Sequence, residues 1–349
     1  MTTADLSAPR QDPLVRALIT IGALVVLFLG THIPFPGFSP DFLQRIGLGP
    51  TLGRISIFAL GVTPIILALS IIEILRLVIP PLGRWSSRPQ NAVKVDRADR
   101  VLALVVAGFQ AFGIAMAVEK MRGFVDEPGL FFRLGLVVTA IGATAVLLWL
   151  SNFVTRYGYG DGLLILLAAP LVAQTPHAIA LWLELSRTGA IPVSPVIGSV
   201  ILAVAAIGSL VLVSLPRSPA SRLGAAANLA RAHLDVWPLL LAATAYGVLI
   251  ILVTFLMYFL GQPLARPSEV LHGLAIAALI ALFAALRARF GGAEGRAPNL
   301  WPMTILQIAI CAGAMIFSYV YQISTENSGF SIIFVVAAVL SLCSRSVRL

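Results

Sequence analysis

The chain has little charge and few residues of the kinds that reactive chemistry uses. Only 11% of its 349 residues are charged, 59% are hydrophobic, and the mean hydropathy is +0.97. Soluble domains contain roughly 45–50% apolar residues, so a water-soluble fold could not hide this apolar surface. The two cysteines, Cys311 and Cys343, fall within apolar runs without metal-ligand spacing, and we interpret them as buried apolar residues rather than a disulfide.

Motifs for catalysis, nucleotide binding and metal binding are also absent from the sequence. The only lysines, Lys94 and Lys120, follow Val93 and Glu119, so no phosphate-binding G-x-x-x-x-G-K-[ST] loop exists. The four histidines form no H-E-x-x-H pair, and we interpret them as loop or boundary residues: His32, His177, His233 and His272. We therefore expect no enzyme activity, no cofactor and no metal site.

Long apolar runs fill the chain instead and are separated by short polar turns. Each run is about long enough to cross a ~30 Å hydrocarbon layer as a helix. The predicted spans are at 15–33, 56–79, 101–118, 131–151, 162–183, 194–214, 237–260, 268–286, 301–321 and 329–345. The fold class is thus all-α and polytopic, with about ten transmembrane helices. The first run lacks a small-x-small cleavage site, so we expect it to be an uncleaved helix.

The basic residues are unevenly divided between the two sets of loops. An even number of spans puts both termini on one side, and that side carries 16 of the 24 Lys and Arg residues, against 7 opposite and Arg76 within a span. The positive-inside rule therefore places both termini in the cytoplasm. The net charge of +9 is attributed to this topology and to anionic lipid, not to nucleic acid.

Two local features have simple structural interpretations. Glu73 and Arg76 are three residues apart on one helical face, so they can neutralise each other; a role in transport is the alternative. A glycine-rich turn contains Gly158, Gly160 and Gly162. It does not match the dinucleotide-binding motif G-x-G-x-x-G, because Leu163 occupies the position of the third glycine. They are interpreted as a tight turn with Asp161 capping the next helix.

Four motifs follow one another in the first half of the chain: Ile33–Gly37 (IPFPG), Ser56–Ile66 (SIFALGVTPII), Phe109–Ala115 (FQAFGIA) and Arg156–Gly162 (RYGYGDG). In type and in order they resemble motifs of the SecY family of protein-conducting channels. The second half resembles the family through its span order, through Val-Trp-Pro at 236–238 and through a final helix beginning near Gly329.

The resemblance implies two five-helix halves, residues 1–185 and 186–349. Family channels have an hourglass pore sealed by a ring of apolar side chains, a plug on its outer side, and a lateral opening between helices 2, 3, 7 and 8. An apolar constriction holds back water and ions by dewetting. The matching ring positions are Val62, Ile66, Leu163, Leu167, Leu240 and Phe334. Ordinary helix packing is the alternative interpretation of these residues.

The sequence departs from the family in its loops. The plug region is shortened to Ile46, Gly47, Leu48 and Gly49. The segments at 216–235 and 287–300 are shorter than the family loops that dock SecA or the ribosome, which puts such docking in doubt. The candidate cytoplasmic contacts are Arg100, Arg287, Arg289 and Arg296, with topology charges as the alternative interpretation.

These observations predict a channel that passes unfolded polypeptides across, or laterally into, a bacterial cytoplasmic membrane. SecE-like and SecG-like small subunits are the expected membrane partners. The short loops favour a specialised paralogue. Two alternatives stay open: a non-translocating membrane scaffold with the same fold, and a small-solute transporter based on Glu73 and Arg76.

Overall fold

The described residues fold almost entirely as helices, and the chain divides into two compact units. The computed structural model describes residues 12–39, 55–86, 88–121, 123–189, 192–214, 235–260, 269–290, 300–321 and 328–346. The first unit comprises Met1–Ile72 and Arg84–Leu167, and the second comprises Glu73–Gly83 and Ala168–Leu349. Two helices, α3 (Thr63–Val78) and α7 (Gly162–Arg187), contribute residues to both units.

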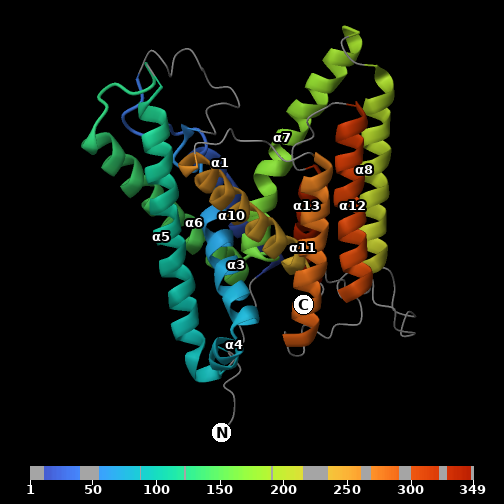
Figure 1. The fold of residues 1–349 in the computed structure, drawn as a ribbon, viewed down its shortest axis with the longest axis horizontal. Coiled ribbons are helices and arrows are strands. Elements are labelled where there is room, and N and C mark those ends of the chain that lie inside the picture. The colour runs from blue at the N-terminus through green and yellow to red at the C-terminus, as the bar shows by residue number, and fades with distance from the viewer. Residues whose placement is uncertain are drawn as a thin grey trace. The chain divides into compact units, whose positions relative to one another are not determined.

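The first unit is built on an antiparallel pair of long helices. Helix α5 (Ala92–Glu119), preceded by the short 3-10 helix η2 (Pro89–Asn91), packs along α6 (Leu130–Tyr157), and α1 (Pro13–Gly30) packs on the same α6 (Figure 1). The buried face of α5 is a ladder of alanines one turn apart, at 103, 107, 111 and 115. Small side chains at this spacing let two membrane helices approach closely.

Aromatic residues close one end of this pair. Phe35 and Phe38 are buried against α5 and α6, and the ring of Phe38 lies edge-on to Phe132 with centroids 6.0 Å apart. Isolated β-bridges join Pro34 to Ser56 and Phe38 to Val125. The segment after α1 is thereby fixed to the turn before α3 and to the α5–α6 connection.

The second unit is arranged around α12. It contains α8 (Val193–Ser214), α10 (Trp237–Phe259), α11 (Glu269–Phe290), α12 (Leu300–Tyr321) and α13 (Ser328–Ser346). Helix α12 packs against α8, α10, α11 and α13, and α10 also packs against α11. Helix α13 also packs directly against α8.

The helices have the length and composition of membrane spans. In the described part of the chain, seven helices are long and apolar enough to cross a membrane. Helix α3 and the short α4 (Pro80–Ser86) are bent by 117° at Ile79, and they give an eighth span if the two count as one. Shorter apolar helices occupy Trp237–Val253 and Phe330–Leu342. Each of the ten predicted spans overlaps a helix, which confirms the all-α polytopic class.

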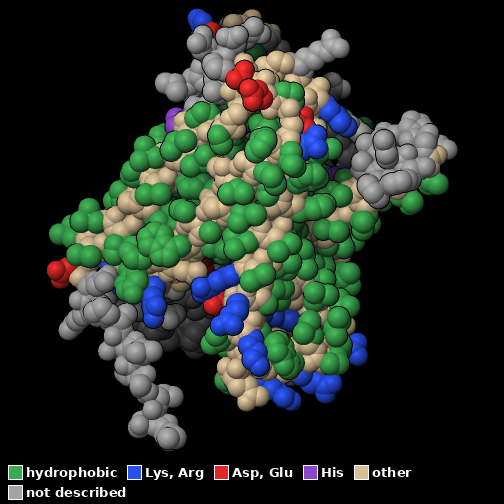
Figure 2. Space-filling model, turned by 90° about the vertical axis from the view of Figure 1, so that its left-hand side faces the viewer, with side chains coloured by type: hydrophobic (Ala, Val, Ile, Leu, Met, Phe, Trp, Pro, Cys, Tyr) green, Lys and Arg blue, Asp and Glu red, His purple; other side chains and the backbone are tan. Residues whose placement is uncertain are grey.

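Apolar side chains cover much of the outer surface. Phe109 is 80% exposed and Phe131 is 93% exposed, which is consistent with lipid, not water, as the surrounding solvent. Figure 2 shows a broad apolar face, with Lys and Arg side chains gathered towards one end. This separation is typical of a helical bundle that spans a bilayer.

The span predicted at 56–79 differs from the structure at both ends. Residues 55–62 form turns, in which the Ala59 and Gly61 amides donate to the Ser56 and Phe58 carbonyls, and the helix begins only at Thr63. Gly61 has φ +53, which favours glycine. Beyond Val78, Pro80 and Pro81 begin the next helix, because proline is tolerated in a first turn but ends a preceding helix.

Candidate channel constriction and its supports

The start of α7 positions the predicted constriction residues Leu163 and Leu167. The Asp161 Oδ1 atom accepts hydrogen bonds from the Leu163 and Leu164 amides, at 2.9 and 3.3 Å. The Gly162 amide donates to the Thr155 hydroxyl of α6 at 2.8 Å. This geometry satisfies three of the free amides at the helix start. The predicted glycine turn capped by Asp161 is confirmed.

Helix α1 stabilises this turn through Thr20. The buried Thr20 hydroxyl accepts a hydrogen bond from the Tyr159 amide at 2.9 Å and donates to the Arg16 carbonyl at 3.1 Å. The Arg16 guanidinium lies 5.4 Å from the Tyr159 ring centroid, a cation–π distance. A Cβ at Gly158 would lie only 2.7 Å from the Thr20 hydroxyl, so glycine permits this close approach.

We expect Thr20→Val to lower the free energy of unfolding by about 1–2 kcal/mol, because the Tyr159 amide loses its acceptor at a buried site. Thermal unfolding of the detergent-solubilised protein measures the change. Thr175→Val is the matched control, because the exposed Thr175 hydroxyl donates only to the Leu171 carbonyl of its own helix. Equal shifts for the two variants would contradict the role given to Thr20.

The start of α3 carries the other two constriction candidates of the first unit. Val62 is buried, and its carbonyl accepts from the Ile66 amide at 3.0 Å, so the two residues stand one turn apart on one face. Ile66 is half-buried, as are Leu163 and Leu167, which are also one turn apart. Each helix start, together with the residue that precedes α3, thus presents a pair of apolar side chains.

The remaining ring candidates belong to the second unit. Leu240 lies in the first turn of α10 and Phe334 lies within α13, and both are buried. The six candidates therefore divide into four in one unit and two in the other. Their assembly into one ring stays a prediction.

The predicted plug and contact residues have different placements. Ile46–Gly49 and Arg296 lie outside the described residues. Arg100 is exposed and paired with Asp96 at 2.7 Å, and Arg289 is exposed. Arg287 is buried in an ion pair with Asp235 at 3.0 Å. Arg100 and Arg289 are thus accessible to a partner, whereas Arg287 faces the interior of its own unit.

The local ion pair within α3 matches the sequence prediction. Arg76 Nη1 lies 3.2 Å from Glu73 Oε2, and both side chains are partly exposed. Each charge therefore has a neutralising neighbour one turn away. Within the described part of the chain, no group of three His, Cys, Asp or Glu residues could hold a metal ion.

Several polar contacts were not predicted from the sequence. Asp235, Arg287 and Gln307 form a largely buried network in the second unit. In the same unit, His272 lies in the first turn of α11, at the boundary of the predicted span, and its Nδ1 is 2.6 Å from the Tyr246 hydroxyl. The only sequence signal for the first network is Asp235, a good N-cap residue just before an apolar run.

The ordered motifs, the helical bundle and the capped α7 turn agree with the comparisons to known proteins. A family model, that of SecY, matches residues 56–328. The chain belongs to the SecY family. Two curated relatives are both named protein translocase subunit SecY. The one from Rickettsia typhi is 32% identical over 206 residues, which is 54% of this chain and 47% of that protein. The one from Escherichia coli K12 is 35% identical over 192 residues, 50% of this chain and 43% of that protein.

The solved structures that resemble this SecY family member extend the likeness to nearly its whole length. Sec61 in the canine ribosome–channel complex from the endoplasmic reticulum superposes with a TM-score of 0.65 at 15% identity, covering 99% of this chain and 95% of the other. A structure described as a protein-conducting channel gives a TM-score of 0.61 with the same identity and coverage. These establish the fold. In sequence matches, the chain spans about half the length of the curated relatives.

Proposed function

We propose that this SecY family member is a protein-conducting channel that passes unfolded polypeptides across, or laterally into, a bacterial cytoplasmic membrane. The observation that carries the proposal is the family match over residues 56–328, together with a fold similar over 99% of the chain to a protein-conducting channel. The chain performs no chemistry in this role, so a partner must supply the driving energy.

The constriction is proposed to consist of the six apolar residues of α3, α7, α10 and α13 and the segment preceding α3. An apolar ring offers no strong binding site to a passing chain, yet it resists water and ions by dewetting. We further propose the halves 1–185 and 186–349, and both termini in the cytoplasm. SecE-like and SecG-like subunits are the proposed membrane partners, and Arg100 and Arg289 are accessible for a cytoplasmic partner.

Site-specific photocrosslinking tests the proposal. A photoreactive residue at Leu163 should crosslink a translocation-arrested precursor in native membranes, because the half-buried side chain would line its path. Val138 of α6 is the control position, because it is 67% exposed on the outer face and should crosslink lipid only. Absence of precursor at Leu163, with the chain correctly inserted, would favour a non-translocating scaffold.

A further inference from the structure

Three helices of the second unit are joined at one end by a small buried network. The Asp235 Oδ1 atom accepts from the Trp237 amide at 3.0 Å and from Arg287 Nη1 of α11, also at 3.0 Å. Gln307 of α12 donates from Nε2 to the Asp235 carbonyl at 2.7 Å. One residue thus binds the first amide of α10 and both neighbouring helices.

The network is buried enough for its charges to depend on each other. The Arg287 side chain is 6% exposed, the Asp235 side chain is 18% exposed, and Gln307 is fully buried. Removing one member of such a pair leaves an uncompensated charge, whereas replacing both by uncharged residues of similar volume is often neutral. A pair of this kind therefore adds little stability over apolar packing, and a role in positioning explains it better.

The part of the chain that the network holds is the first turn of α10. Leu239, Leu241 and Ala242 are fully buried there, and the Leu240 amide donates to the Val236 carbonyl at 3.0 Å. Leu240 is the constriction candidate of this helix. The position of its side chain thus depends on how Asp235 fixes the start of α10 against α11 and α12.

We propose that Asp235, Arg287 and Gln307 are positioning residues that hold Leu240 in the closed constriction. The proposal rests on the proposed channel function. In this proposal Arg287 positions α10 instead of contacting a cytoplasmic partner. The ion leak through the closed constriction then depends on a charge pair that lies outside the apolar ring.

The test is a double-mutant cycle with Asp235→Asn and Arg287→Met in the full chain with its membrane partners. Asparagine keeps a side-chain oxygen that can accept from the Trp237 amide, so Asp235→Asn removes the charge but keeps this hydrogen bond. We expect each single variant to speed amide exchange over residues 237–242 by about 100-fold, because the largely buried ion pair that joins the start of α10 to α11 is broken. In the same single variants, the leak of ions through the channel without a translocating chain should also rise. The double variant should restore both readouts to nearly the wild-type values.

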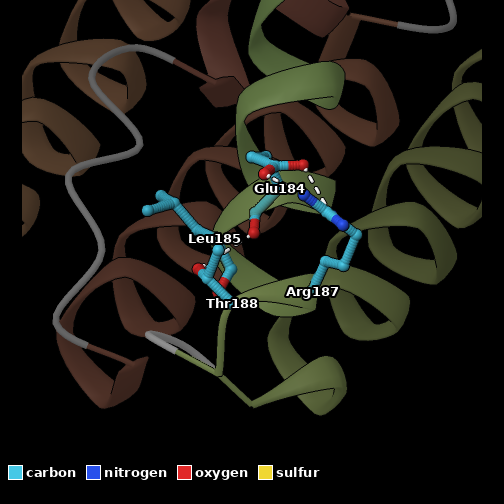
Figure 3. A network of polar contacts seen from close by, with 4 residues as sticks. All are labelled: Glu184, Leu185, Arg187 and Thr188. Carbon is cyan, nitrogen blue, oxygen red and sulfur yellow. Dashed lines mark hydrogen bonds and ion pairs between the residues drawn. The ribbon is translucent and has the colours of Figure 1, made fainter.

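The exposed pair Glu184–Arg187 of α7 is the matched control (Figure 3). Arg187 makes two hydrogen bonds to the Glu184 carboxylate, at 2.9 and 2.7 Å, but the side chains are 76% and 55% exposed. Glu184→Gln with Arg187→Met, made singly and together, should change neither readout, because exposed pairs contribute little.

Two results would overturn the proposal. One is additive effects in the double variant, and the other is wild-type leak in both single variants, which together with faster exchange would make the network merely structural. If the single variants fail to accumulate, the double variant decides: its accumulation with a normal seal is expected, and its loss contradicts the proposal. Failure of the proposed function is detected separately, as absence of precursor crosslinking at Leu163 in the wild-type chain.

Discussion

Gly162→Ala is expected to destabilise the protein by about 3 kcal/mol or more, because the new methyl group has no room. The Cβ would overlap the carbonyl oxygen of Ser151 and would lie 2.9 Å from its carbonyl carbon and 3.0 Å from the Thr155 hydroxyl. The first atoms are backbone atoms of α6, which cannot rotate away. The first residue of α7 must therefore separate from α6, which also breaks the hydrogen bond from the Gly162 amide to Thr155.

Thermal unfolding in detergent, with limited proteolysis at the α6–α7 turn, measures this effect. Gly142→Ala is the matched control, since Gly142 lies within α6 and a Cβ there meets no atom within 4 Å. The control should be neutral or slightly stabilising, because alanine favours a helix interior over glycine. If both substitutions gave the same melting temperature, the close approach of α7 to α6 would be wrong.

The local features of this turn were predictable from sequence. Glycines at 158, 160 and 162 indicate a tight reversal, and Asp161 directly before an apolar run indicates a helix start. The apolar runs likewise predict the helices, because in lipid a run of this length must satisfy its own backbone hydrogen bonds. The motifs predicted the family as well, since they retain both residue type and order.

Contacts between distant residues could not be predicted in this way. Thr20 and Tyr159 are 139 residues apart, and Asp235 is 72 residues from Gln307. Hydrophobic periodicity shows which face of a helix is buried, but it contains no information on which helix covers that face. Arg287 illustrates the consequence. Its position near the end of a span suggested contact with a cytoplasmic partner, whereas in the structure it forms an ion pair with Asp235 of the same unit.

The constriction is the hardest part to derive from sequence, for a chemical reason. Leu163 and Leu167 are apolar residues one turn apart, and so are most residues on the buried face of a membrane helix. No charge, metal ligand or nucleophile distinguishes a ring that seals a pore from a ring that packs a core. Only a measurement of what crosses the ring separates the two interpretations.

Leu163→Ser combined with Leu167→Ser is expected to raise the resting ion conductance of the channel by more than roughly tenfold. Burial of one leucine corresponds to about 1.5–3 kcal/mol, and lowering a barrier by 1.4 kcal/mol increases a rate about tenfold. Two hydroxyls in place of two isobutyl groups therefore remove much of the free-energy cost of wetting the constriction. Conductance in planar bilayers, normalised to the amount of inserted protein, measures the effect without any translocating chain.

The control applies similar substitutions to a pair on the outer face of the first unit. Leu134 and Val138 of α6 are also one turn apart, and they are 51% and 67% exposed. Leu134→Ser with Val138→Ser makes the surface more polar to a similar degree but leaves any pore unchanged, so its conductance should equal that of the wild type. Equal conductance of the two double variants would mean that Leu163 and Leu167 pack a core, and the seal would have to come from other residues. A leak confined to the α7 variant would place these two leucines at the barrier itself, because the same loss of apolar surface elsewhere has no such effect.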